Sequence, residues 1–261
     1  MITLTSDFGL KDPYVAEMKA VILTVNPNAV LIDITHEVEK FNIRMAAFML
    51  ASAAPYFPKG TVHIAVVDPD VGTERRAILV QTKRGFFVVP DNGVLILAAQ
   101  NQDIEHIYKL TNPRFMLPRV SPTFQGRDVF APAAAYADKG FKPSEFGEEI
   151  SDAVTLDFAR VKRKDDSLIG EVLHVDDFGN IITNISEGEL TKSQFKAMNV
   201  KLQNFSAKVA FGETYAQTKA REPIGLIGSH GFLEIALNKG NAAEKFHSKA
   251  GESIVVNLLK Q

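Results

Sequence analysis

The 261-residue chain contains no cysteine and no tryptophan. The lack of cysteine excludes a disulfide framework and cysteine-ligated metal sites. No apolar run approaches the roughly 20 residues that a membrane helix needs, and the first residues lack the basic and apolar segments of a secretion signal. We therefore expect a protein of the cytoplasm with no membrane partner.

The chain also lacks an excess of charge of either sign. Lys and Arg total 29 against 31 for Asp and Glu, so the formal net charge is −2. Proteins that bind nucleic acid usually carry a basic face, so we expect no nucleic-acid partner. The densest basic cluster, residues 160–164, is followed at once by Asp165 and Asp166, which is typical of a solvated linker.

Neither of the common phosphate-binding glycine motifs, G-x-G-x-x-G and G-x-x-x-x-G-K-[ST], occurs in the chain. The cradle for a pyrophosphate is therefore missing. The histidines are few and none has zinc-ligand spacing, so we expect no metal and no cofactor. If the chain binds a nucleoside-containing ligand, a nucleoside or a sulfonium is favoured over a nucleotide.

The first part of the chain alternates strand-like and helix-like segments, which predicts an α/β domain, residues 1–160, with a mostly parallel sheet flanked by helices. The expected strands are 2–5, 30–34, 61–67, 77–82 and 85–89, and the expected helices are 13–25, 43–54 and 128–139. The strand at 30–34 reads as buried.

The last hundred residues consist mainly of short strand-like runs separated by turn residues, which predicts a smaller β-barrel or sandwich domain at 168–261. The expected strands are 168–175, 181–184, 200–202, 207–211, 223–227, 232–237 and 253–258. Only 189–196 reads as a helix, and the boundary between the domains is expected within 160–167.

Carboxylates and glycines follow three of the predicted parallel strands. Asp7 and Asp12 follow the first, Asp68 follows the third, and Asn92 follows the fifth. Ligands of open parallel sheets bind beyond the carboxyl ends of the strands, so these residues are candidates for one site, with Asp7 placed to bind ribose hydroxyls. The alternative is that Asp, Asn and Gly simply form turns and cap helices.

Asp68 lies seven positions before Arg75, in an acidic and basic stretch. An arginine beside Asp68 should favour the carboxylate form, and the pair could orient and polarise a water molecule. The alternative is a surface ion pair of little energetic value. Further polar turns at 123–128, 176–180 and 228–231 could bind a ligand, or could be an ordinary helix cap and hairpin turns.

Six motifs, in this order along the chain, resemble those of one family. They are SDFG at 6–9, VDPDVGTERR at 67–76, PDNG at 90–93, TFQGRD at 123–128, DDFGNIITNI at 176–185 and GSHGFLEIALN at 228–238. The family is the S-adenosylmethionine hydroxide adenosyltransferases, which are related to the fluorinase and chlorinase enzymes. The resemblance covers nearly the whole chain. It implies that S-adenosylmethionine and water give adenosine and L-methionine, by attack at the ribose 5′ carbon.

The resemblance also implies roles for individual residues. The family's catalytic trio of Asp, Arg and His falls on Asp68, Arg75 and Gln125, so the chain departs from the family at the third position. Halogenating relatives carry a tyrosine where Asp68 stands, which favours a hydrolase. Asp7 would bind the ribose, Tyr215 would stack on adenine, and the full set of implied substrate-binding residues is Asp7, Phe8, Asp12, Phe41, Asn92, Asp176, Phe178, Asn180, Tyr215, Ser229, His230, Glu234 and Asn238.

Asn180 and Asn238 would bond the adenine edge, while Asp176, Ser229 and His230 would hold the methionine end. Family members are trimers, with each site built between the first domain of one chain and the second domain of its neighbour. Because an amide at Gln125 cannot take up a proton near neutral pH, hydrolysis is expected to be slow. A protein that binds S-adenosylmethionine or adenosine without turnover remains the main alternative, and a halogenase is a more distant one.

Overall fold

The computed structural model describes residues 1–100, 102–190 and 195–260. The chain forms two compact units, Met1–Leu156 (unit 1) and Asp157–Gln261 (unit 2). The stretch 160–167, where the boundary was expected, therefore lies within unit 2. There Lys162–Lys164 forms a short edge strand, β7.

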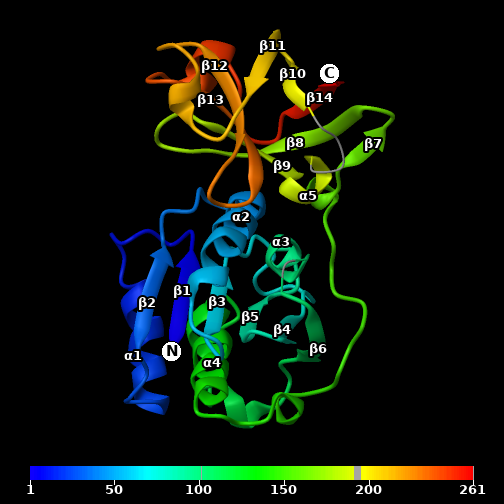
Figure 1. The fold of residues 1–261 in the computed structure, drawn as a ribbon. Helices are drawn as coiled ribbons and strands as arrows, with labels where there is room; N and C mark the ends of the chain where they lie inside the picture. The colour runs from blue at the N-terminus through cyan, green and yellow to red at the C-terminus, as the bar shows by residue number, and fades with distance from the viewer. Residues whose placement is uncertain (101, 191–194, 261) are drawn as a thin grey trace. The chain divides into compact units, whose positions relative to one another are not determined.

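Unit 1 contains a six-stranded sheet in the order β2-β1-β3-β5-β4-β6 (Figure 1). The strands are β1 (Ile2–Ser6), β2 (Leu31–Thr35), β3 (Val62–Val66), β4 (Ala77–Thr82), β5 (Phe86–Pro90) and β6 (Ile104–Lys109). The first four strands in the order are parallel, while β4 runs antiparallel to both β5 and β6. The expected mostly parallel sheet is confirmed, and β6 is a strand that the sequence did not predict.

Helices cover both faces of this sheet (Figure 1). They are α1 (Tyr14–Val25), α2 (Ile43–Ala53), α3 (Ile96–Gln100) and α4 (Ala131–Asp138), with a π-helix at Gly126–Phe130 leading into α4. Helices α1 and α4 pack against each other and share a core with alternate residues of the central strands, such as Leu4, Ile64 and Val88. Every residue of β3 is buried, as expected for a central strand covered on both faces.

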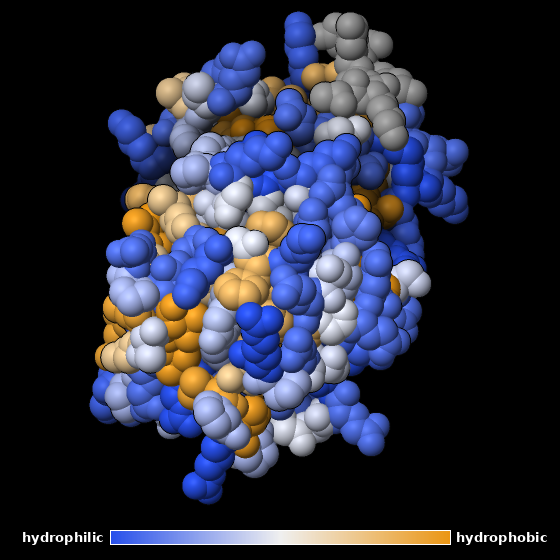
Figure 2. Space-filling view, turned by 90° about the horizontal axis from the view of Figure 1, so that it is seen from below, coloured by the Kyte–Doolittle hydropathy of each residue, from blue (hydrophilic) through white to orange (hydrophobic). Residues whose placement is uncertain are grey.

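The expectation of a buried strand at 30–34 was wrong. Strand β2 is the sheet edge and, among the described strands, pairs with β1 alone, so its side chains are half-buried or exposed. Figure 2, which views the molecule from below, shows hydrophobic residues gathered on the side where α1 and β2 lie in Figure 1. Leu23, Val30 and Ile32 are among the large exposed apolar residues of this region.

Unit 2 is the predicted β-barrel. Its strands follow the order β14-β10-β11-β12-β13-β9-β8, and pairing of β14 with β8 closes seven strands into a ring. They are β8 (Ser167–Val175), β9 (Ile181–Ser186), β10 (Phe195–Leu202), β11 (Phe205–Phe211), β12 (Pro223–Ile227), β13 (Phe232–Leu237) and β14 (Ser253–Lys260). Alternate residues such as Met198, Val200 and Leu202 fill the interior.

The helices of unit 2 differ from the expectation. Helix α5 spans Glu187–Leu190, and β10 begins at Phe195. The expected helix at 189–196 is therefore wrong at positions 195 and 196, which belong to the strand. Residues 191–194 of that segment lie outside the described part of the chain. A second helix, α6 (Ala242–Phe246), was not predicted, and Asn241 caps it by accepting a hydrogen bond from the Glu244 amide at 2.7 Å.

Candidate functional site

The carboxyl ends of β1, β3 and β5 lie at the same edge of the sheet, because the three strands are parallel neighbours. Asp7 follows β1, Asp68 follows β3 after Val67, and Asn92 follows β5 after Asp91. The fold therefore gathers the polar residues that the sequence placed after three separate strands, as expected for open α/β sheets.

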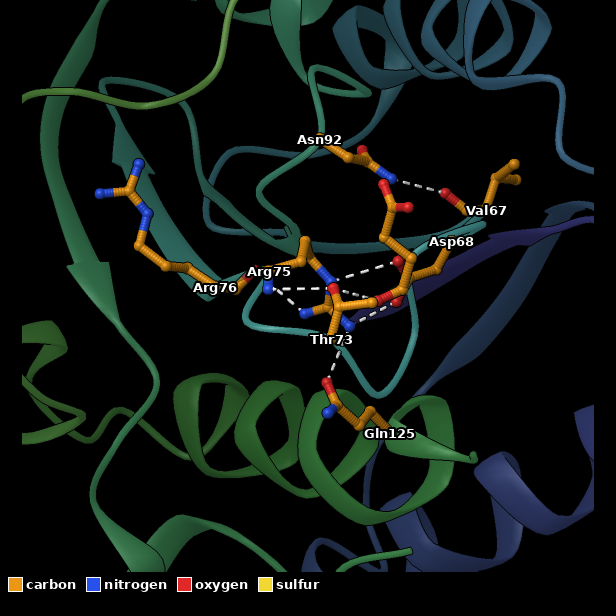
Figure 3. Close-up of polar contacts among 8 residues, drawn as sticks. Val67, Asp68, Thr73, Arg75, Arg76, Asn92 and Gln125 are labelled. Atoms are coloured by element: carbon orange, nitrogen blue, oxygen red, sulfur yellow. Dashed lines mark hydrogen bonds and ion pairs between the residues drawn. The ribbon is translucent and has the colours of Figure 1, made fainter. Parts of the chain in front are cut away.

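Asp68 and Arg75 form a two-pronged ion pair (Figure 3). Arg75 Nε donates to Asp68 Oδ1 at 3.1 Å and Arg75 Nη2 donates to Oδ2 at 2.5 Å. Both side chains are only 5% exposed. Arg75 Nη1 also donates to the Arg76 carbonyl at 3.0 Å, and the guanidinium carbon lies 5.5 Å from the centre of the Phe130 ring. Arg75 is thus held on several sides, and it fixes the orientation of the Asp68 carboxylate.

Burial has the largest effect on the ionisation of Asp68 and raises the pKa of its carboxyl, while Arg75 opposes that rise. The expectation that Arg75 favours the carboxylate form is confirmed, but burial outweighs that effect. The reason is that the pair is withdrawn from water, and desolvation disfavours the charged form of an acid. A raised pKa makes Asp68 a better proton acceptor than an exposed aspartate.

Gln125 completes a polar cluster with this pair. It lies at the start of the π-helix Gly126–Phe130, and its Oε1 accepts a hydrogen bond from Arg75 Nη2 at 2.8 Å. Figure 3 shows the Gln125 side chain pointing from its helical turn toward Arg75, while Arg76 points away from the cluster. The three residues implied as catalytic therefore form one hydrogen-bonded chain, although Gln125 lies fifty positions beyond Arg75.

A cavity of about 520 Å³ opens beside this cluster, and we call it the unit 1 cavity. Asp7 Oδ2 accepts the backbone N–H of Phe41 at 2.9 Å, and the Lys40 ammonium donates to the Asp7 carbonyl. Phe41 has a positive φ of 65° and a side chain exposed to 67%. Of the residues implied by the resemblance, the cavity is lined by Asp7, Phe8, Asp12, Phe41, Asp68 and Gln125.

Asn92 does not line this cavity. Its side chain is buried, and its Nδ2 donates to the carbonyl of Val67 at 2.8 Å (Figure 3). Because Val67 precedes Asp68, this bond holds the end of β3 that carries the carboxylate. The geometry fits a role in positioning the loop better than direct contact with a ligand.

Sequence reasoning missed an aromatic wall of the unit 1 cavity. Phe8, Tyr14 and Phe124 contact one another edge to face, with ring centres 5.2–5.9 Å apart. Tyr14 opens α1, and Phe124 lies in the TFQGRD motif beside Gln125. Phe8 and Phe124 lie in quoted motifs and Tyr14 does not, so only the fold shows that the three rings meet.

Asp128, which sequence reasoning also passed over, is completely buried. Its Oδ2 accepts the Ser121 amide at 2.7 Å and its Oδ1 accepts Arg127 Nε at 2.6 Å. Arg127 in turn donates to Glu17 on α1 at 2.7 Å. These bonds tie the loop that carries Phe124 and Gln125 to the body of unit 1.

Unit 2 contains a second cavity, of about 1000 Å³, which we call the unit 2 cavity. Asp176 shapes one side, since its Oδ1 accepts the amides of Phe178 and Asn180 and its Oδ2 accepts Asn180 Nδ2 at 2.9 Å. The side chain of Phe178 is 79% exposed. The lining includes every unit 2 residue implied by the resemblance, namely Asp176, Phe178, Asn180, Tyr215, Ser229, His230, Glu234 and Asn238.

A hydrogen-bond chain crosses this cavity. The Tyr215 hydroxyl donates to Glu234 Oε1 at 2.7 Å, and His230 Nε2 lies 3.3 Å from Glu234 Oε2. Burial raises the pKa of Tyr215, and the hydrogen bond to Glu234 raises it further. The Tyr215 hydroxyl therefore stays protonated as a donor. Tyr215, which is 42% exposed as a residue, is anchored to the barrel through this hydrogen bond.

Two features are absent from the part of the chain that the structure describes. In that part of the chain, no three His, Cys, Asp or Glu side chains are grouped as metal ligands would be. None of its helices has the length and apolar character to span a bilayer.

Comparison with known proteins gives consistent matches along the chain. Residues 2–147 match the SAM hydroxide adenosyltransferase N-terminal domain, and residues 170–255 match the C-terminal domain of the same family. A relative named (R)-S-adenosyl-L-methionine hydrolase, from Methanocaldococcus jannaschii, is 38% identical over 94% of this chain and 90% of its own. A relative of the same name from Thermus thermophilus is 37% identical over 94% and 95%.

More distant and structural matches agree with these. A fluorinase from an Actinoplanes species is 26% identical over 98% of this chain and 97% of its own. The crystal structure of an uncharacterized conserved protein from Thermotoga maritima has a TM-score of 0.91 and 38% identity, and the match covers 98% of this chain and 100% of that one.

Proposed function

The chain belongs to the S-adenosylmethionine hydroxide adenosyltransferase family, and we propose that it hydrolyses S-adenosylmethionine to adenosine and L-methionine. Water forms a bond to the ribose 5′ carbon, the bond from that carbon to sulfur breaks with its electron pair going to sulfur, and one proton is released. The reaction needs no cofactor. The observation that carries the proposal is the buried Asp68 carboxylate, held by Arg75 at the edge of a cavity that Asp7 also lines.

Asp68 is proposed to orient the attacking water and to accept its proton. Its raised pKa supports this role, and Arg75 keeps the carboxylate pointing in one direction. The leaving group is a neutral thioether departing from a sulfonium, so no general acid is required. Positioning of the water against the carbon is where a rigid carboxylate contributes most.

The two cavities supply groups suited to the parts of the substrate. In unit 1, Asp7 would accept from the ribose hydroxyls, and Asp12 and Phe41 would line the ribose and sulfonium region. In unit 2, Tyr215 would stack on adenine while Asn180 and Asn238 bond its edge. Asp176, Ser229 and His230 would hold the amino-acid end of the substrate. Each of these residues lines one of the two cavities, which supports the assignment.

Gln125 is proposed to make the hydrolysis slow. Its amide oxygen accepts from Arg75, and an amide has no basic lone pair that takes up a proton near neutral pH. Help of the order of 10²–10⁴-fold from a general base must therefore come from Asp68 alone. Ligand binding should be normal, because Gln125 retains the hydrogen-bonding capacity that holds the site together.

A protein that binds S-adenosylmethionine without turnover is the second candidate, and Gln125 is the feature that favours it. A halogenase is disfavoured because the Asp68 carboxylate would repel a halide. Incubation with S-adenosylmethionine, with and without chloride or fluoride, followed by chromatography separates the three. Adenosine supports the hydrolase, a 5′-halogenated adenosine supports a halogenase, and intact ligand that copurifies with the protein supports a binder.

We further propose that the protein acts as a homotrimer in the cytoplasm, where its substrate is found. Support comes from the exposed apolar residues Leu23, Val30 and Ile32 and from exposed Phe41 and Phe178 at the two cavities, since apolar patches of this kind often mark protein interfaces. In such an assembly, unit 1 of one copy would complete a site with unit 2 of a neighbour. An active monomer in light scattering at micromolar concentration would refute this proposal.

A further inference from the structure

Glu234 lies on β13 with only 3% of its surface exposed. Its Oε1 accepts the Tyr215 hydroxyl and its Oε2 faces His230 Nε2. A carboxylate whose two oxygens already hold protein partners, and which is almost fully buried, presents little surface to a ligand. Tyr215 and His230 come from different segments of the barrel, so Glu234 is the residue that connects them.

The direction of these hydrogen bonds is set by the backbone. The Phe232 N–H donates to His230 Nδ1 at 3.2 Å, so Nδ1 has no proton in the neutral ring and Nε2 carries it. His230 therefore donates to Glu234, as Tyr215 does. Glu234 accepts from both sides, which is the role for which an ionised carboxylate is suited.

Gly228 provides independent support. A Cβ at this position would lie 2.4 Å from His230 Nε2 and 2.7 Å from Glu234 Oε2. Real Cβ atoms do not approach other atoms so closely. Because Gly228 has no side chain, His230 and Glu234 can meet in the space that a Cβ would occupy.

We propose that Glu234 is a positioning residue that fixes Tyr215 and His230 as one unit, in place of contacting the ligand itself. The proposal rests on the proposed function, in which Tyr215 stacks on adenine. A ring anchored through its hydroxyl loses less rotational freedom on binding, so the anchor raises affinity. Its loss raises the Kd for adenosine and the KM for S-adenosylmethionine, whereas kcat, which depends on the unit 1 cluster, changes little.

Three variants separate anchoring from simple structural damage. Glu234→Leu removes both acceptors and should raise the Kd for adenosine about tenfold, or about 1.4 kcal/mol. Glu234→Gln should raise it less than about threefold, because the amide oxygen can accept from His230 and the Tyr215 hydroxyl can turn to accept from the amide. Gly228→Ala should resemble Glu234→Leu, because the new methyl group displaces the pair.

A double-mutant cycle tests the connection directly. Tyr215→Phe cuts the anchor while it leaves the ring and the carboxylate in place, and should raise the Kd for adenosine about fivefold. In the Tyr215→Phe background, Glu234→Leu should add less than about twofold to the Kd. Glu244→Leu on α6, an exposed carboxylate outside the cavity, is the control for loss of charge and should change the Kd less than about twofold.

Calorimetry with adenosine and initial rates with S-adenosylmethionine give all the required quantities. Losses that add fully in the cycle, or a fall in kcat equal to the rise in KM, overturn the positioning role. If Glu234→Leu does not fold, an unchanged Kd in both Tyr215→Phe and Gly228→Ala overturns it equally. If the wild type binds adenosine and hydrolyses S-adenosylmethionine, and the variants have the same Kd and KM as the wild type, only the positioning role is refuted. A wild-type protein that does neither refutes the proposed function and the positioning role together.

Discussion

Replacing Asp68 with Asn removes one negative charge from the candidate catalytic cluster while it preserves the shape of the side chain. The Asn oxygen can still accept one hydrogen bond from Arg75, but its amide group then faces a second guanidinium N–H. Arg75, whose side chain is 5% exposed, loses its counter-charge and keeps, besides that one bond, its bonds to Gln125 Oε1 at 2.8 Å and the Arg76 carbonyl at 3.0 Å. The substitution therefore removes both the base and the orientation of its partner.

The expected effect on turnover follows from the role assigned to Asp68. General-base catalysis contributes typically 10²–10⁴-fold to kcat, which corresponds to roughly 3–5 kcal/mol of activation free energy at 1.36 kcal/mol for each tenfold. Adenosine affinity should change less than about threefold, because Asp68 is not among the residues assigned to adenosine. Initial rates measured by chromatography and adenosine titrations by calorimetry provide the two numbers.

Asp70→Asn is the matched control, since it makes the same change of charge two residues away on an exposed side chain. Its kcat should stay within about twofold of wild type. A kcat for Asp68→Asn that is also within about twofold, under roughly 0.5 kcal/mol of barrier, would refute the reasoning. In the wild type, the acid limb of kcat/KM should lie above the ordinary Asp pKa of 3.8, because burial raises the pKa of Asp68, and Asp68→Asn should lack that limb.

Three other substitutions test separate parts of the account. Gln125→His should raise kcat and add a dependence on pH below neutrality, since protonation of a histidine facing Arg75 is disfavoured; an unchanged rate between pH 5 and 9 would count against proton removal at this position. Tyr215→Ala should weaken adenosine binding by about 1–3 kcal/mol, the usual value of stacking on a base, and an unaltered calorimetric Kd would argue against stacking. His63 is buried, and desolvation lowers its pKa from 6.5 to about 4, so its ring stays neutral in the folded protein. The stability that this neutral ring allows is full above about pH 6.5. It is lost as the pH falls toward 4, by up to about 3 kcal/mol of unfolding free energy. In urea unfolding, His63→Phe should reduce this loss, and an identical slope of stability against pH in both proteins would contradict it.

The positions of β1 to β5 and of the main helices of unit 1 could be predicted from the sequence, because their apolar residues recur at strand or helix spacing. The edges of the sheet, strand β6 and helix α6 could not be predicted in this way. The run VLIDI at 30–34 is apolar in four of five positions, and such a run does not tell a central strand from the edge strand that β2 is. Strand β6 carries Glu105 and His106 among its apolar residues, and α6 is only five residues long, too short for a helical period to be seen.

For the candidate site, too, the sequence predicted some features and not others. Motif spacing indicated which residues gather at the ends of β1 and β3, because the topology of a parallel sheet leaves little freedom. It did not indicate that Arg75 bonds Gln125 fifty positions away, or that Tyr215 bonds Glu234. Nor did it indicate that burial outweighs Arg75 in the pKa of Asp68. Contacts and desolvation depend on how distant segments pack, and a single sequence does not contain that information.

Following the oxygen of the attacking water is the most direct test of hydrolysis directed by Asp68. S-adenosylmethionine is incubated with the protein in water enriched in ¹⁸O, the products are separated, and their masses are measured by mass spectrometry. If water attacks the 5′ carbon, adenosine carries ¹⁸O on its 5′ hydroxyl, methionine carries none, and the Asp68→Asn protein forms neither product at a comparable rate. Unlabelled adenosine, or labelled adenosine formed equally fast by Asp68→Asn, would contradict hydrolysis directed by Asp68.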